Sequence, residues 1–240
     1  MFKFKQIFVA TIFATFSIVI LITTNITKDI PYKDLKAEFK NENSRFIKVD
    51  GILVHYVDEG EGPPIILLHG TGASLHTWDL WTEKLKENYR VLSITLPGFG
   101  LSGPRLDKRY EIKDYVDFLD NFVELVGIEK FYLVGNSLGG SIAWLYSSFY
   151  DEKIKKLILI NSSGFEMVEI PFVIRIAKNK FLNFLVKKAA VKFLIKKSLK
   201  EVYYDDKLIS KSIIDRYYKL SLREGNRQAF IDRALINYVD

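Results

Sequence analysis

The chain has 240 residues, of which 48% are hydrophobic, and its 35 basic and 29 acidic side chains give a formal net charge of +6. This length supports one sizeable core with a small lid, and the mild, dispersed charge does not indicate a nucleic-acid partner. The absence of cysteine excludes disulfides and thiolate chemistry, and His55, His69 and His76 lack the clustered spacing of a zinc site. We therefore expect no metal site and no nucleic-acid partner.

The first predicted element is an apolar N-terminal helix. Lys3 and Lys5 precede the twenty uncharged residues from Ile7 to Ile26, which as a helix would span about 30 Å, enough to cross a bilayer. A small-residue cleavage site is not evident, so the pattern favours an uncleaved single-pass anchor over a signal peptide or a buried core helix. We expect residues 1–27 to be a membrane anchor, 28–45 a linker, and the following domain to lie on the outer, periplasmic or extracellular side.

Strands and helices then alternate along the chain. Residues 45–59 predict two strands joined at Asp50-Gly51, and residues 65–68 predict a buried strand. A helix from about residue 75 to 85, a strand ending at Pro97-Gly98, and an amphipathic helix ending at Gly127 follow. Residues 131–134 and 154–160 give two more strands. This order predicts an α/β fold with a doubly wound, mostly parallel sheet and ligands at the carboxyl ends of its strands.

A lone serine lies between glycines directly after one of these strands. The run Gly135-Asn136-Ser137-Leu138-Gly139 has the G-x-S-x-G spacing of a nucleophile elbow, in which a strand turns sharply into a helix. Small residues on both sides of Ser137 are needed because the turn is tight. The pentapeptide alone leaves open an inert turn with a solvated serine.

Three motifs in order carry a family resemblance. They are LLHGTGAS at residues 67–74, LPGFGLSG at 96–103 and GNSLGG at 135–140. With them, residues 46–164 resemble the α/β-hydrolase superfamily, especially its lid-bearing branch of esterases, epoxide hydrolases, dehalogenases and carbon-carbon bond hydrolases. A serine at position 137 disfavours the chemistries of that branch that use a carboxylate nucleophile.

The resemblance assigns roles to particular residues. It implies that Ser137 is the nucleophile and that the backbone N–H groups of Thr71 and Leu138 form an oxyanion hole. It also implies that His69 and Gly70 support the loop beside the nucleophile, as Gly135 and Gly139 support the elbow. The implied substrate is a small apolar or amphiphilic carbonyl compound, and no cofactor is required.

The expected base is missing from the sequence. The family order is serine, then an acid, then histidine, yet no histidine follows His76. Asp205, Asp206, Asp215 and Asp232 are acids by residue type, but surface positions suit them better. We therefore expect a truncated, inactive serine hydrolase, or, as an alternative, a non-catalytic binding or receptor protein that kept the pocket.

The last predicted region, residues 165–240, reads as a helical lid that ends before the family's final strands. Nine basic residues and no acid lie between Glu169 and Glu201, mixed with apolar residues. Two interpretations remain open for this segment: lid helices packed over an apolar pocket, or a membrane-surface helix.

Overall fold

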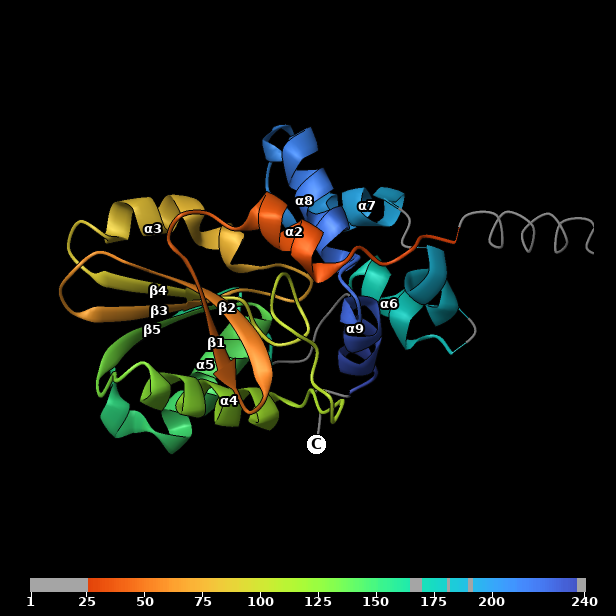
Figure 1. Ribbon diagram of the computed structural model, residues 1–240. Coiled ribbons are helices and arrows are strands. Elements are labelled where there is room, and N and C mark those ends of the chain that lie inside the picture. Colours follow the sequence, from red (N-terminus) through yellow and green to blue (C-terminus); the bar gives the residue numbers. More distant parts are fainter. Residues whose placement is uncertain (1–25, 165–169, 181, 190–191, 237–240) are drawn as a thin grey trace, which may run out of the picture.

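A six-stranded sheet forms the centre of the molecule (Figure 1). The computed structural model describes residues 26–164, 170–180, 182–189 and 192–236. The strands are β1 (Ser44–Val49), β2 (Ile52–Glu59), β3 (Pro64–Leu68), β4 (Arg90–Ile94), β5 (Phe131–Asn136) and β6 (Ile154–Ile160), in the spatial order β1-β2-β4-β3-β5-β6. The pairs β1–β2 and β2–β4 are antiparallel, whereas β4–β3, β3–β5 and β5–β6 are parallel. The sheet is therefore mixed, and the expected parallel part extends from β4 to β6.

The antiparallel edge is a hairpin whose turn lies where the sequence indicated. Asp50 and Gly51 have φ values of 50° and 78°, and two consecutive residues with positive φ give the turn whose twist matches that of the strands. Val49 then pairs with Ile52 across this two-residue loop. This hairpin lies next to β4, and the parallel strands run from β4 to β6 at the opposite edge of the sheet.

Helices cover both faces of the sheet, because alternate strand residues point to opposite sides. Ile66 and Leu68 of β3 belong to the large core beneath the helices α4 and α5, whereas Ile65 and Leu67 belong to a smaller core with Trp78. The covering elements are η1 (Leu75–Trp78), α3 (Asp79–Leu85), α4 (Ile112–Leu125), α5 (Leu138–Phe149) and the short turn η2 (Asp151–Lys153). In Figure 1, α3 lies above the sheet and α4 and α5 lie below it.

Helix α4 follows the predicted apolar stripe. Tyr115, Phe118, Leu119 and Phe122 are all buried. Leu125, the last residue of the helix, is 56% exposed. The helix starts with reciprocal bonds between Glu111 and Asp114, in which each side chain accepts from the other residue's backbone N–H.

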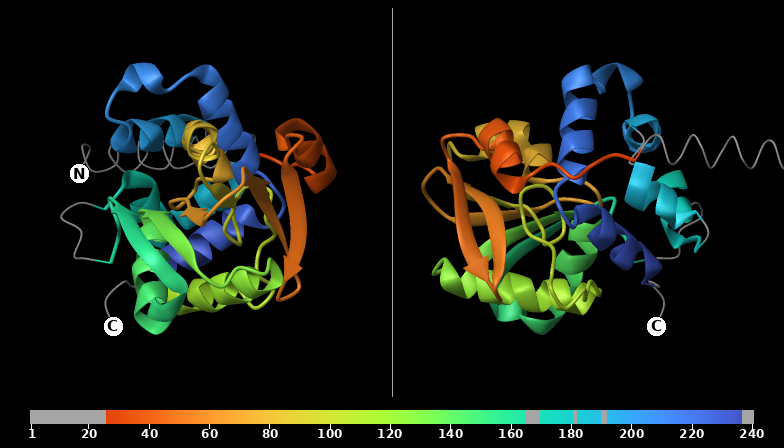
Figure 2. Two further views of the ribbon diagram at one scale, coloured as in Figure 1. Left: turned by 90° about the vertical axis from the view of Figure 1, so that its left-hand side faces the viewer. Right: turned by 45° about the vertical axis from the view of Figure 1, so that its right-hand side comes forward.

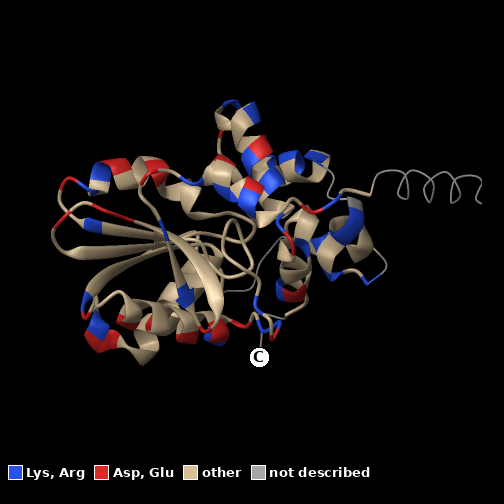
Figure 3. Cartoon of the chain, in the orientation of Figure 1, with Lys and Arg blue, Asp and Glu red and all other residues tan. Residues whose placement is uncertain are grey.

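A group of helices beyond the sheet forms the lid (Figure 2). They are α6 (Phe172–Lys178), the π-helical turn η3 (Leu185–Ala189), α7 (Lys192–Val202), the short turn η4 (Asp206–Leu208), α8 (Lys211–Ser221) and α9 (Asn226–Leu235). Basic side chains lie along α6 and α7, where few acidic ones accompany them (Figure 3). Leu199 of α7 is 3% exposed and lies on the wall of a pocket, so one side of α7 packs against the rest of the chain.

The segment that we expected to be a linker contains a packed helix, α2 (Tyr32–Phe39). Its Leu35 is fully buried against Leu101 of the core and Leu220 of α8. Just before α2, Ile30 forms a parallel bridge with Arg223, and its N–H donates to the Leu222 carbonyl at 2.8 Å. Residues 26–39 therefore join the lid to the core.

The predicted membrane-spanning helix, and the membrane localisation that followed from it, are not supported. Residues 7–25 of that prediction lie outside the described residues. Within the parts of the chain that are described, no helix is long and apolar enough to cross a bilayer. The longest of these helices, α4, has 14 residues and so measures about 21 Å, against a hydrocarbon core of about 30 Å. The predictions of a single-pass anchor and of a domain on the outer side of a membrane are therefore wrong for the described chain.

Candidate active site

Ser137 lies at the turn between β5 and α5, at the carboxyl end of a central parallel strand. Its φ of 51° and ψ of −114° are unfavourable for a residue with a side chain, at a cost of about 1–3 kcal/mol. Backbone hydrogen bonds hold this conformation: the Ser137 N–H donates to Ile160, and its carbonyl accepts from Ser141 and Ser163, each at 3.1 Å. The strand, turn and helix therefore follow one another as the G-x-S-x-G spacing implies.

The glycines around Ser137 are required by close backbone packing. A Cβ on Gly135 would overlap the carbonyl of Gly139, and a Cβ on Gly139 would overlap the carbonyl of Leu68. A Cβ on Gly140 would lie 2.6 Å from the Ser162 hydroxyl oxygen. Each contact is too short for a real side chain, so the start of α5 can lie against β3 and β5 only with glycine at these positions.

The Ser137 hydroxyl faces a cavity. Its Oγ makes no hydrogen bond to any residue that the structure describes, and Ser137 lines a pocket of about 220 Å³. A hydroxyl with no internal partner at the wall of a cavity is available to a bound molecule. This is the geometry expected of a nucleophile and not of a serine that stabilises a turn.

Two backbone amides next to this hydroxyl are also free. Within the described parts of the chain, neither the Thr71 N–H nor the Leu138 N–H has an acceptor. Leu138 is the first residue of α5, where N–H groups have no partner inside the helix. Thr71 lies on the pocket wall, in the loop after β3. A Cβ on its neighbour Gly70 would be 3.1 Å from the Ser137 Cβ, so the loop and the elbow are in contact.

His69 holds this loop in place through both ring nitrogens. Nε2 accepts from the Leu96 N–H at 3.0 Å, so Nδ1 carries the proton and donates to the Gly70 carbonyl at 2.7 Å. Burial of the ring lowers the pKa of His69 to about 4. With both nitrogens bonded and the neutral form favoured, His69 supports the loop and cannot also accept a proton from Ser137.

His55 and His76 are also bonded within the fold. His76 Nε2 donates to the Phe39 carbonyl at 3.0 Å while its Nδ1 accepts from Ser74, and His55 Nε2 is 2.9 Å from the Ser44 hydroxyl. Ser74, which precedes η1, thus bonds His76 and makes no side-chain cap. Burial lowers the pKa of His55 to about 3 and that of His76 to about 4. Neither histidine lines the pocket of Ser137.

The four aspartates considered as candidate acids do not reach the elbow. Asp206 pairs with Lys200 and Asp215 with Lys192, both within the lid. Asp205 accepts from the Lys207 N–H at 2.9 Å, and Asp232 accepts from Gln228. The described residues thus bring together Ser137, the Thr71 and Leu138 amides and the loop that His69 supports, and no described Asp, Glu or His lines this pocket.

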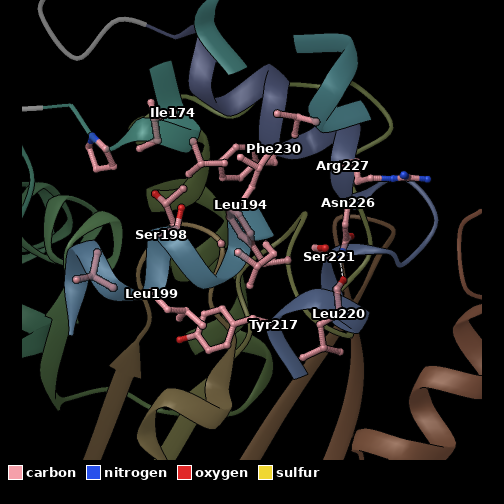
Figure 4. Close-up of a pocket in the computed structure, with 18 of the residues that line it drawn as sticks. Ile174, Leu194, Ser198, Leu199, Tyr217, Leu220, Ser221, Asn226, Arg227 and Phe230 are labelled. Carbon is pink, nitrogen blue, oxygen red and sulfur yellow. Dashed lines mark hydrogen bonds between the residues drawn. The ribbon is translucent and has the colours of Figure 1, made fainter. Parts of the chain in front are cut away.

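The pocket that Ser137 faces lies between the sheet and the lid (Figure 4). Its core-side wall comes from the elbow and from the loops after β3 and β4, and its other wall comes from α6 to α9. Apolar side chains dominate the lid side, namely Val173, Ile174, Val186, Leu194, Ile195, Leu199, Val202, Leu220 and Phe230. Such a wall favours an apolar ligand whose reacting group lies at Ser137.

Some residues of the site could not be found from the sequence. Asn136 donates to the Ile160 carbonyl at 3.1 Å and so ties the elbow to β6. Arg227 lies on the pocket wall and bonds Asp29 at 2.6 Å. No sequence pattern links two residues 198 positions apart, so only the folded chain shows this pair.

The chain matches the family described as "alpha/beta hydrolase fold" over residues 63–194. It therefore belongs to the α/β-hydrolase family, which confirms the resemblance inferred from the three motifs. Its sheet order and the serine elbow after β5 agree with this assignment.

Among the proteins similar to this chain are two hydrolases matched by sequence and one solved hydrolase structure. The chain is 27% identical over 193 residues to 2-hydroxymuconate semialdehyde hydrolase of Pseudomonas sp., covering 79% of this chain and 65% of that protein. It is 25% identical over 194 residues to 2-hydroxy-6-oxo-2,4-heptadienoate hydrolase of Pseudomonas putida, covering 79% of this chain and 66% of that protein. A solved meta-cleavage product hydrolase from Pseudomonas fluorescens IP01 is 26% identical with a TM-score of 0.65, covering 78% of this chain and 66% of that one. The match thus spans about two thirds of the length of each relative.

Proposed function

We propose that this chain is a serine hydrolase that cleaves an ester-like or related carbonyl substrate through Ser137. One observation carries the proposal: an unbonded hydroxyl on a strained turn faces a cavity beside two unbonded backbone amides. Acyl transfer needs a nucleophile and donors for the oxyanion, and these residues supply both.

The proposed reaction begins with attack by the Ser137 oxygen on the substrate carbonyl carbon. The carbonyl π electrons move to the oxygen, which the N–H groups of Thr71 and Leu138 stabilise. Collapse of this intermediate breaks the bond to the leaving group, which takes up the proton that the Ser137 hydroxyl loses, and leaves an ester on Ser137. Attack of water on this ester then releases the acid and restores the hydroxyl. Each amide donor in such a site contributes about 3 kcal/mol to stabilisation of the transition state.

Proton transfer is the slow part of this proposal. Among the described residues, the nitrogens of His69 and His76 are bonded and His55 is remote from the pocket wall. Loss of the histidine in a serine hydrolase costs on the order of a millionfold in turnover. We therefore infer that the chain as given reacts slowly with activated electrophiles and has negligible turnover of ordinary esters.

Two other functions could use the same pocket: cleavage of a compound other than an ester, and binding without reaction. The names of the Pseudomonas relatives point to cleavage of oxo-dienoate compounds, a reaction that also needs a polarised carbonyl. A binding protein with a hydrolase-like pocket would use the cavity without the hydroxyl. Only the first of these depends on Ser137, so the reactivity of that residue separates them.

The test is the reaction with p-nitrophenyl butyrate followed by absorbance and intact mass. We expect slow release of one equivalent of nitrophenol with one butyryl group retained, and acceleration by added imidazole, which supplies a base. Ser137→Ala should abolish the retained group. Ser148→Ala, an exposed position on the same helix α5, serves as the control and should behave as the parent. Nitrophenol release that is equal in parent and Ser137→Ala would contradict the proposal.

A further inference from the structure

One charged side chain lies on the described wall of the Ser137 pocket, that of Arg227 at the start of α9. Its Nη2 donates to the Asp29 carboxylate at 2.6 Å and to the Thr27 carbonyl at 2.8 Å, and its Nη1 reaches the Lys188 carbonyl at 3.5 Å. The side chain is 10% exposed. In Figure 4 its guanidinium points away from the apolar side chains of the wall.

The charge of Arg227 is therefore neutralised from outside the pocket. Asp29 belongs to the segment before α2, which lies against the lid through bonds from Thr27 to Lys188 and from Ile30 to Leu222. This segment brings a carboxylate to the outer side of Arg227. Among the residues that the structure describes, no other charged side chain lines the pocket side of this wall.

A second arginine near the pocket is paired in a similar way. Arg216 of α8 lies next to the wall residue Tyr217, and its Nη1 is 3.6 Å from the Asp79 carboxylate of α3. Arg216 itself does not line the cavity. Arg227 and Arg216 thus both face carboxylates from other parts of the chain.

We propose that Asp29 determines the charge selectivity of the Ser137 pocket, so that the pocket takes an uncharged apolar substrate and rejects one that carries a carboxylate on its buried part. This inference rests on the proposed function only for the identity of the site, since it concerns binding and not turnover. It separates this chain from a relative whose name specifies a dienoate.

The physical reason is the cost of burying an unpaired charge. A carboxylate that leaves water for an apolar cavity loses its hydration, and it recovers this loss only if a cation or several donors meet it. In this cavity the guanidinium already has a carboxylate partner. A neutral ester avoids this loss, and a volume of about 220 Å³ holds roughly seven groups of the size of a water molecule or a methylene.

The experiment compares methyl hexanoate, the neutral ester, with monomethyl adipate, the anion. Monomethyl adipate has the same ester group but carries a carboxylate in place of the far methyl group, and this carboxylate is fully ionised at pH 8. Binding is measured by isothermal titration calorimetry on the full chain carrying Ser137→Ala, so that no acyl transfer interferes. In this background we expect the neutral ester to bind at least about tenfold more tightly than the anion. Adding Asp29→Asn keeps an oxygen at Arg227 but removes the charge, and it should improve the relative affinity for the anion by about fivefold.

The matched control is Asp34→Asn, an exposed acid on α2 with the same change in net charge, which should leave the ratio unaltered. Adding Arg227→Gln to Asp29→Asn should restore the preference for the neutral ester. Three results would each overturn the proposal. The Ser137→Ala protein could bind the two ligands equally, it could bind neither, or Asp29→Asn and Asp34→Asn could change the ratio equally. Because Ser137 is absent from these proteins, failure of its chemistry would not alter these outcomes.

Discussion

Gly70 lies so close to Ser137 that a Cβ on Gly70 would be only 3.1 Å from the Ser137 Cβ. This contact brings the loop after β3 against the elbow after β5, two strands that are neighbours in the sheet. The same loop carries the free Thr71 amide. The proximity of donor and nucleophile therefore follows from sheet order and from one residue without a side chain.

A methyl group at position 70 should separate these two elements. We expect Gly70→Ala to slow acylation of Ser137 by about tenfold to a hundredfold, because a small displacement of a donor or nucleophile is costly in rate. The measurement is the rate of butyryl transfer from p-nitrophenyl butyrate. Gly103→Ala is the matched control, since a Cβ there meets nothing closer than 3.6 Å. Equal rates in the two variants would show that the contact has no effect on reactivity.

The role of His69 predicts a loss of stability. His69→Leu removes the acceptor of the buried Leu96 N–H, so the free energy of unfolding should fall by about 2 kcal/mol. Urea titration followed by tryptophan fluorescence measures this change. If His69 were instead the base, the variant would keep its stability and lose acylation, which is the opposite pattern.

Three buried histidines predict a decline of stability in acid. Their folded pKa values of about 3 to 4 lie below the ordinary 6.5, so the unfolded chain binds protons first as the pH falls. The stabilisation is complete above about pH 6.5 and is lost as the pH falls from there toward 4. Between pH 7 and pH 5.5, protonation of each histidine in the unfolded chain should lower the free energy of unfolding by about 1 kcal/mol. The variant His76→Gln should lose about 1 kcal/mol less stability than the parent between pH 7 and pH 5.5. An equal loss in both proteins, measured by urea titration at the two pH values, would contradict the prediction.

The packing of α2 predicts that residues 32–39 contribute to the fold. Leu35 is fully buried between Leu101 and Leu220, so Leu35→Ala should lower the free energy of unfolding by about 3 kcal/mol. Lys33→Ala, an exposed position on the same helix, should change it by less than about 0.5 kcal/mol. A similar small change in both variants, measured by urea titration, would show that α2 does not stabilise the domain.

Much of the sheet could be predicted because local patterns determine it. The Asp50-Gly51 turn, the buried run from Ile65 to Leu68 and the stripe of α4 each depend on residues close in sequence. The elbow was predictable for the same reason, since Gly135 and Gly139 lie on either side of Ser137.

Other features depend on residues far apart in sequence. The sequence around Leu35 does not distinguish a packed helix from a polar linker, because the residues that bury Leu35, Leu101 and Leu220, are far away in the sequence. The pairing of Asp29 with Arg227 could not be predicted for the same reason. Hydropathy alone suggested a membrane helix near the N-terminus, and the described structure does not support it.

The central claim is that Ser137 is a nucleophile in an accessible pocket. Its most direct test is incubation of the full chain with a fluorophosphonate, followed by digestion and tandem mass spectrometry to locate the adduct. The account predicts a single phosphonylated residue, Ser137, and loss of the adduct when the protein is unfolded in urea before labelling. An adduct on other serines with Ser137 unmodified, or equal labelling of folded and unfolded chains, would contradict it.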